Sequence, residues 1–191
     1  MKKRVFAIAV IVICLSIITG STFAFYTKTG TARNVITSGG VEVKVLEQKL
    51  ENGTLTDYPA GEVPIMPATK VSKIVSVQSL QQPAWVRMTY TLQVLDENEE
   101  EQDIPVEELK KVILIDPDDS NWEEKNGWWY YKKAIKNGEI TKPLFQEVVF
   151  SGAEMGNEYQ GCKLKVTVVA QAVQKANNGA TFDKAAGWPE T

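Results

Sequence analysis

Apolar and polar residues alternate with a period of two along several stretches of this chain, and this pattern limits the fold more than any other feature. In residues 86–94 every second residue is apolar, and the residues between them are Arg, Thr or Gln. Residues 41–45 and 163–170 repeat the pattern. Such alternation is typical of strands with one buried face. The apolar Val169 on the outer face of the last stretch favours a central place for it in a sheet.

Shorter elements complete the expected fold. Residues 71–77 and 147–150 read as strands, and Asn126-Gly127 between strand-forming residues predicts a hairpin over 122–131. Residues 105–112 fit two helical turns. The sequence therefore predicts an all-β domain, an antiparallel β-sandwich or jelly roll with one or two short helices.

Two segments are expected to lie outside the strands. Residues 50–67 are rich in Gly, Pro, Thr and Asp and are interpreted as a long surface loop. Thr181 is expected to cap a short turn over residues 182–186, which Gly187 ends.

The first 24 residues read as a secretory signal peptide. Basic residues 2–4 precede an apolar run over 5–15 and a stretch that ends in small residues. The expected cut follows Ala24, with Thr22 and Ala24 as the small residues at positions −3 and −1 and Phe25 as the first mature residue. Because the apolar run is too short for a spanning helix, we expect a secreted protein with no stable membrane span after cleavage. A retained N-terminal anchor is the alternative.

Charge and cysteine content restrict the mature chain further. Removal of 24 of the 191 residues leaves 167, with 18 basic and 24 acidic side chains and a formal net charge of −6. This balance argues against nucleic acid and against an anionic membrane surface as partners. Cys162 is the single thiol of residues 25–191, so an intrachain disulfide is excluded and a half-buried structural thiol is expected.

Several kinds of catalytic and metal site are absent from the sequence. The chain has no histidine, which removes Ser-His-Asp and Cys-His arrangements and histidine zinc sites. We therefore expect no enzymatic activity and no cofactor. A weak calcium possibility rests on Asp116, Asp118 and Asp119, but Asn121 and Gly127 stand where an EF-hand needs Gly and Glu. A plain turn is the favoured interpretation.

The densest aromatic cluster lies on the expected hairpin. It comprises Trp122, Trp128, Trp129, Tyr130 and Tyr131. On a strand, Trp128 and Tyr130 share one face, and Trp129 and Tyr131 share the other. One face must therefore lie outside the core or be covered by another element. Ordinary packing and a surface for a glycan or protein partner both remain open.

Three parts of the chain resemble one family. They are Gly20 to Glu47, with the aromatic pair Phe25-Tyr26 and the Gly-led strand 41–45; Gln82-Pro-Ala-Trp-Val-Arg-Met88; and residues 166–174 with Asn177-Asn-Gly-Ala180. Together they resemble the TasA/camelysin family of exported Gram-positive biofilm-matrix and surface fibre proteins, whose signals are cut by a dedicated signal peptidase. The resemblance implies a jelly-roll domain that polymerises when a freed N-terminal segment completes the sheet of a neighbour.

The sequence gives this implication a physical basis. After cleavage the chain divides into an extended arm over 25–37 and a jelly-roll domain over 38–191, the signal being 1–24. The arm is rich in Thr and β-branched residues, and such a segment can add to an open sheet edge. The arm residues singled out are Phe25, Tyr26, Thr27, Thr29, Thr31, Asn34 and Val35. A loose terminus or an intramolecular edge strand is the other interpretation.

Two functions follow as hypotheses. The first is a secreted structural protein of an extracellular fibre or biofilm matrix, assembled by N-terminal strand addition. Its partners would be further copies of itself, related matrix proteins and, during export, a signal peptidase. The second is a monomeric cell-surface module that binds a glycan or protein partner through the Trp122–Tyr131 hairpin.

Overall fold

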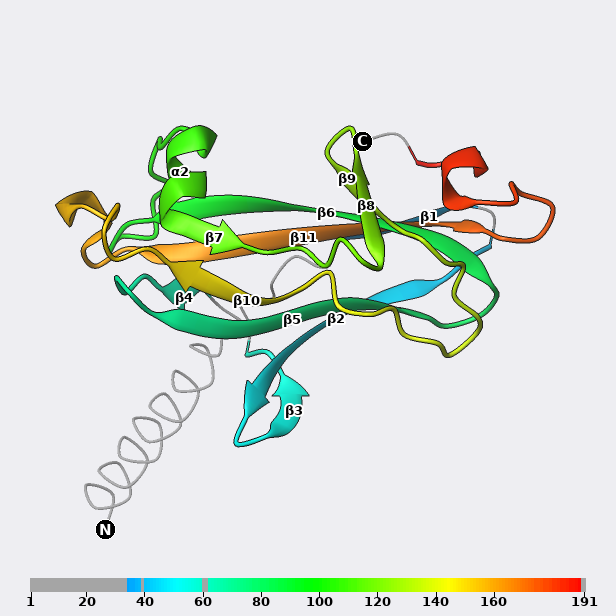
Figure 1. Cartoon of the computed structure of the whole chain (residues 1–191), viewed down its shortest axis with the longest axis horizontal. Helices are drawn as coiled ribbons and strands as arrows, with labels where there is room; N and C mark the ends of the chain where they lie inside the picture. Colours follow the sequence, from blue (N-terminus) through cyan, green and yellow to red (C-terminus); the bar gives the residue numbers. More distant parts are fainter. Residues whose placement is uncertain (1–33, 39, 60–61, 190–191) are drawn as a thin grey trace, which may run out of the picture. The chain divides into compact units, whose positions relative to one another are not determined.

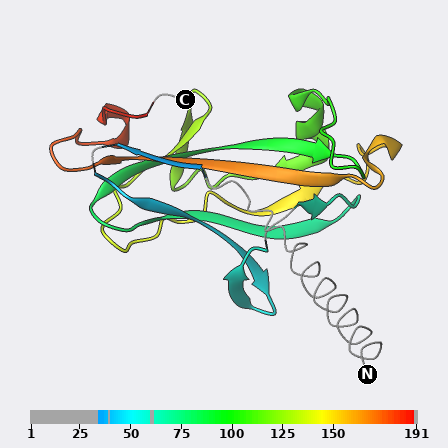
Figure 2. The same ribbon diagram turned by 180° about the vertical axis from the view of Figure 1, so that it is seen from behind.

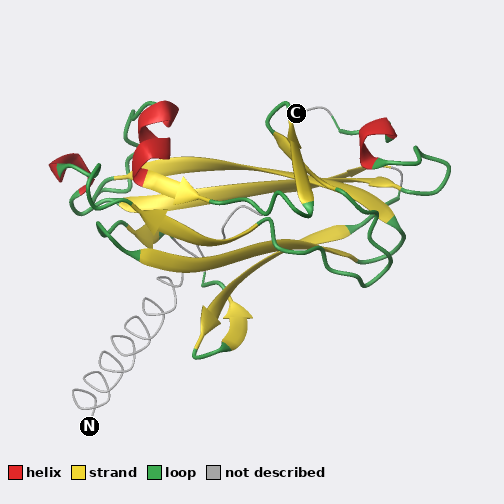
Figure 3. Ribbon diagram, in the orientation of Figure 1, coloured by secondary structure: helices red, strands yellow, loops and turns green. Residues whose placement is uncertain are grey.

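The alternating stretches form two facing β-sheets in a computed structural model of the chain (Figure 1). The structure describes residues 34–38, 40–59 and 62–189. Strands make up most of its regular secondary structure, as Figure 3 shows. The expected all-β sandwich with short helices is confirmed.

Sheet A contains the two longest strands at its centre. Its strands, in spatial order, are β1 (Asn34–Ser38), β11 (Lys163–Gln174), β6 (Ala84–Leu95), β9 (Trp128–Tyr131) and β8 (Trp122–Lys125), with β4 (Val63–Pro64) beside one end of β11. β6 and β11 pair antiparallel along their whole length. The central place predicted for β11 is therefore confirmed. β1 differs from the other strands of this sheet because it runs parallel to its neighbour, with Asn34 opposite Val169 and Ser38 opposite Val173 (Figure 2).

Sheet B faces the inner side of sheet A. In spatial order its strands are β3 (Thr54–Asp57), β2 (Val43–Glu51), β5 (Lys70–Ser79), β10 (Phe145–Phe150) and β7 (Ile113–Ile115). All the pairings in this sheet are antiparallel.

The core lies between the sheets and is built from the alternating apolar residues. Fully buried side chains include Met88 and Leu164 from sheet A and Val45, Val75 and Phe145 from sheet B. Burial of one such side chain contributes roughly 1.5–3 kcal/mol, so the inward faces of β5, β6 and β11 are the main stabilising feature of the sandwich.

The expected surface loop over 50–67 is wrong for much of its length. β2 continues to Glu51 and turns at Asn52-Gly53 into β3, and Val63–Pro64 forms β4. Asn52 and Gly53 both have positive φ, 51° and 79°. This backbone suits a two-residue hairpin turn, and Asn and Gly are the residues that tolerate it. The same signal at Asn126-Gly127 produces the predicted β8–β9 hairpin.

The helical segments are short. The predicted helix is present as α2 (Val106–Val112), which buries Leu109 and Val112 and runs directly into β7. The turn expected over 182–186 is a single 3₁₀ turn, Phe182–Lys184, and a second one covers Asn157–Tyr159. None of the helices in the described ranges has the length and apolarity needed to cross a membrane.

Candidate functional site

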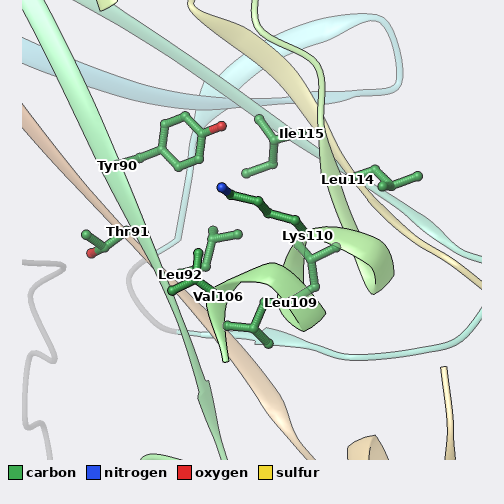
Figure 4. A pocket seen from close by; sticks show the side chains of 9 residues that line it. Tyr90, Thr91, Leu92, Val106, Leu109, Lys110, Leu114 and Ile115 are labelled. Atoms are coloured by element: carbon green, nitrogen blue, oxygen red, sulfur yellow. The ribbon is translucent and has the colours of Figure 1, made fainter. Parts of the chain in front are cut away.

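An apolar cleft of about 390 Å³ opens between the two sheets beside α2 (Figure 4). Its walls come from three elements: Tyr90 and Leu92 on β6, Val106 and Leu109 on α2, and Ile113 and Ile115 at β7. Leu92 and Ile115 are only partly buried, although both pack against the core. The cleft is therefore a place where the interior of the sandwich is open to solvent.

One wall of the cleft is an unpaired strand edge. β6 pairs with β9 at Arg87 and Met88 alone, and further along the same edge Val94 O accepts from Gln102 N at 2.8 Å. Residues 89–93 between these points have no partner strand on this side within the described chain. In an antiparallel strand, alternate residues direct both their N–H and C=O groups to the same edge. Since Val94 O points to this edge, the backbone groups of Tyr90 and Leu92 also point to it.

The facing wall is a second free edge. β7 is the outermost strand of sheet B, and β10 is its one partner among the described strands. Val106 on α2 is 62% exposed and Leu114 on β7 is 47% exposed. Two free edges and exposed aliphatic side chains thus border one apolar cleft, an arrangement that favours the addition of a strand.

Polar groups of the cleft are few. Figure 4 shows the Lys110 side chain directed across the opening toward the Tyr90 ring. The Tyr90 ring packs edge-on against Phe145, with 5.4 Å between ring centroids. Burial raises the pKa of the Tyr90 hydroxyl above its ordinary value, so it is protonated at neutral pH. The Lys110 ammonium group is paired with Glu107 at 3.0 Å. The polar side chains of the lining are therefore Tyr90, Thr91 and this paired Lys110.

The structure locates only part of the expected N-terminal arm. Asn34 and Val35 belong to β1 and pair with β11 of the same chain, so for these residues the intramolecular edge strand is observed. The other arm residues, Phe25, Tyr26, Thr27, Thr29 and Thr31, lie outside the described residues, as do Thr22 and Ala24 of the cleavage site. A segment free to exchange would thus end before Asn34.

The hairpin aromatics do not form one exposed surface. Trp122 is fully buried, and its Nε1 donates to the carbonyls of Lys142 at 3.1 Å and Pro143 at 3.2 Å. Its ring packs on Tyr131 at 4.9 Å between centroids. Trp129 packs against the same core. For Trp122 and Tyr131 the proposed partner surface is therefore wrong, because both side chains fill the sandwich.

The other face of the hairpin is covered by a different element. The Tyr130 ring lies 5.7 Å from Phe182 and 5.4 Å from Trp188, so the C-terminal segment packs over it. Trp128 lies against the guanidinium of Arg87, with Cζ 4.3 Å from the ring centroid. Sequence reasoning missed Arg87, since its place in the alternation marks it only as an outward residue.

The aspartates considered for calcium form a turn. The Asp118 carboxylate accepts hydrogen bonds from Asn121 Nδ2 at 2.7 Å and from the backbone N–H groups of Ser120 and Asn121. These bonds, led by the Asn121 side chain, lower the pKa of Asp118. Across the described residues, the structure brings together no group of three or more His, Cys, Asp or Glu side chains that could hold a metal ion.

No protein-family model, curated protein or solved structure matches this chain. Its function therefore has to be inferred from its own residues, and the cleft beside α2 is the site with the clearest geometry.

Proposed function

We propose that this chain is a secreted subunit of an extracellular fibre, and that the cleft between β6 and β7 accepts the N-terminal segment of a neighbouring copy. The observation that carries the proposal is the edge of β6 at residues 89–93, which no described strand pairs and which borders an apolar opening into the core. The resemblance of residues 20–47 to the TasA/camelysin family supports the same assembly.

Strand addition uses both features of this cleft. An added strand would bond to the free N–H and C=O groups of Tyr90 and Leu92, while its alternate side chains enter the space beside Leu109 and Ile113. Main-chain hydrogen bonds give affinity with little dependence on sequence, and the apolar pocket selects the side chains that face inward.

The length of the arm is sufficient for this role. At about 3.3 Å per residue, the nine residues 25–33 reach about 30 Å, whereas the five residues 89–93 span about 17 Å. Phe25 and Tyr26 supply large rings at the free end, and the Thr residues that follow favour an extended backbone. The arm can therefore cover the free edge while β1 stays paired with β11 of its own chain.

Electron microscopy and sedimentation of mature protein beginning at Phe25 would test the proposal. We expect filaments from this form, and monomers from a chain that lacks residues 25–33 but retains β1. Leu92→Arg places a charged side chain in the cleft and should also give monomers. Leu50→Arg is the matched control, because Leu50 is 55% exposed on the β2–β3 hairpin, outside the cleft, and should polymerise normally.

A mixing experiment separates strand addition from other modes of assembly. The chain without residues 25–33 retains an intact cleft, and the Leu92→Arg chain retains an intact arm. Neither should polymerise alone, but an equimolar mixture should form dimers that stop at two subunits. Filaments formed by the truncated chain, or a mixture that stays monomeric while wild-type protein polymerises, would contradict this use of the cleft.

A further inference from the structure

On the outer face of sheet A, the side chain of Arg87 is surrounded by aromatic rings. Gln171, Arg87 and Tyr130 are direct cross-strand neighbours on β11, β6 and β9. Arg87 Nε and Nη2 donate to Gln171 Oε1 at 2.8 and 2.6 Å, and Nη1 donates to the Tyr130 hydroxyl at 2.7 Å. We call Arg87, Gln171, Trp128, Tyr130 and Trp188 the Arg87 box.

The guanidinium of Arg87 has no carboxylate partner among the described residues. The guanidinium lies 4.3 Å from the Trp128 ring centroid, 4.8 Å from that of Trp188 and 5.6 Å from that of Tyr130. Within the described residues, none of the ion pairs involves Arg87. Aromatic rings attract a cation but leave its charge in place. The box can therefore take up an anion.

A second donor in the box, the Gln171 side-chain amide, has no partner in the described part of the chain. Gln171 is fully buried, and its Nε2 makes no hydrogen bond to any residue that the structure describes. The orientation of the Gln171 amide is fixed, because its Oε1 accepts two hydrogen bonds from Arg87. If the amide were flipped, its NH2 group would face the N–H groups of Arg87, and no hydrogen bond could form. A buried N–H group without an acceptor is unfavourable. An acceptor oxygen placed within reach of both Arg87 and Gln171 Nε2 would remove this unfavourable contribution.

The end of the described chain covers this position. Pro189 O accepts from Arg87 Nη2 at 3.2 Å, and Trp188 packs on Tyr130. The rest of the segment is fastened further away, since the Asn178 side chain bonds both N–H and C=O of Ala186, at 2.8 and 3.0 Å. The Trp188 Nε1 group donates to Ala185 O at 3.1 Å, within the same segment. For the box to open, Trp188 and Pro189 would have to move away while Ala186 stays bonded to Asn178.

We propose that the Arg87 box binds a hexuronate unit of an acidic polysaccharide in the place of Trp188 and Pro189. The sugar carboxylate would accept from Arg87 and Gln171, and Trp128 and Tyr130 would stack on the pyranose ring. Lys175 lies on the same aromatic face, 4.8 Å from the Trp85 ring centroid. Lys125, 4.9 Å from the Phe182 ring centroid, is paired with Glu123 at 2.9 Å. Lys175 therefore supplies a second cation for a polymer with a charge on each unit. This inference does not depend on the fibre proposal.

Tryptophan fluorescence titration of the mature chain with polygalacturonate tests this site. Trp188→Ala should bind at least roughly tenfold tighter than wild type. When a segment covers a site, the apparent affinity is reduced in proportion to the fraction of molecules in which the site is open, and this variant should raise that fraction. Adding Arg87→Lys to that variant should remove the gain, since lysine lacks the planar fork that grips a carboxylate. Binding should weaken with added salt. Lys44→Gln, an exposed change on β2, is the control for general surface charge and should have no effect.

Two other polymers and one truncated chain serve as controls for the polygalacturonate titration. Neutral dextran should not bind, and poly-L-glutamate should bind at least roughly tenfold more weakly than polygalacturonate, because it has no ring face to stack on Trp128. Equal or tighter binding of poly-L-glutamate would overturn the assignment to a sugar and indicate an acidic peptide. If neither Trp188→Ala nor a folded chain ended after Gly187 binds polygalacturonate, Arg87 only fastens the C-terminal segment and the proposal is wrong.

Discussion

The ammonium group of Lys73 lies 2.5 Å from the carboxylate of Glu47 inside the sandwich, and both side chains are almost completely buried. The two residues stand on the adjacent strands β5 and β2, and the Tyr58 ring covers the Lys73 ammonium at 4.1 Å. A buried charge is tolerable only while its partner is present.

Loss of one member of this pair is therefore expected to destabilise the fold strongly. Lys73→Met or Glu47→Gln should lower the free energy of unfolding by about 3–5 kcal/mol, whereas the double variant Lys73→Met/Glu47→Leu should recover most of the loss. Urea denaturation measures both. The exposed pair Lys70–Glu147 is the control, and Lys70→Met should cost at most about 1 kcal/mol. Equal costs at the two pairs would show that the Lys73–Glu47 pair is not desolvated in solution.

Tyr58 should make stability depend on alkaline pH. Burial, and secondarily the Glu47 carboxylate, raise its pKa in the folded chain above the usual value of about 10. The unfolded chain loses this proton first as the pH rises. The contribution to stability is therefore complete below about pH 10 and is lost as the pH passes through the folded pKa.

An ultraviolet absorbance titration, taken as the difference between wild type and Tyr58→Phe, would measure this ionisation. In Glu47→Gln the pKa of Tyr58 should fall but stay raised, because burial is the larger cause. A Tyr58 that titrates at the ordinary value would contradict the burial seen here.

The hairpin tryptophans should differ sharply in their effect on stability. Trp122→Ala removes a fully buried ring and should cost about 3–5 kcal/mol. Trp128→Ala removes a partly exposed ring that contacts the Arg87 guanidinium and should cost about 1 kcal/mol. Thermal or urea unfolding of the two variants measures the difference, and similar losses would mean that the hairpin is not fixed in the sandwich as described.

Cys162 should react slowly as long as the chain is folded. The thiol is buried, and burial, followed by the charges of Asp96 and Glu97, raises its pKa, so that it is protonated at neutral pH. The thiolate is the reactive form. Ellman's reagent should therefore modify the native protein much more slowly than the protein in urea. Equal rates would indicate an exposed or ionised thiol.

Local patterns predict much of this fold. β6 and β11 were evident because long alternation with one buried face leaves a period-two pattern, and α2 was evident from the spacing of Val106, Leu109 and Val112. β3 was missed because Leu50 and Leu55, which pair across the β2–β3 hairpin, are both exposed. A hairpin without a buried face produces no such pattern, and the Asn52-Gly53 turn was its remaining signal.

The candidate sites could not be predicted in the same way. The cleft exists because the pairing of β6 with β9 ends at Met88 and leaves residues 89–93 of that edge without a partner strand among the described residues. Where such pairing ends depends on residues distant in sequence. The Arg87 box likewise joins β6, β9, β11 and the C-terminal segment. Local alternation identified Arg87 as outward-facing but could not place Gln171 or Trp188 beside it.

The parallel pairing of β1 with β11 has a mechanical consequence. Tension directed along the axis of β1 would load its five register pairs with β11 together, in shear. A pull perpendicular to the strand, in the direction of its inter-strand hydrogen bonds, would instead separate the pairs one at a time and at a lower force. The parallel pairing of β1 would therefore resist a pull along this strand, which is the load that the proposed fibre would place on it if its arm continued in line with β1.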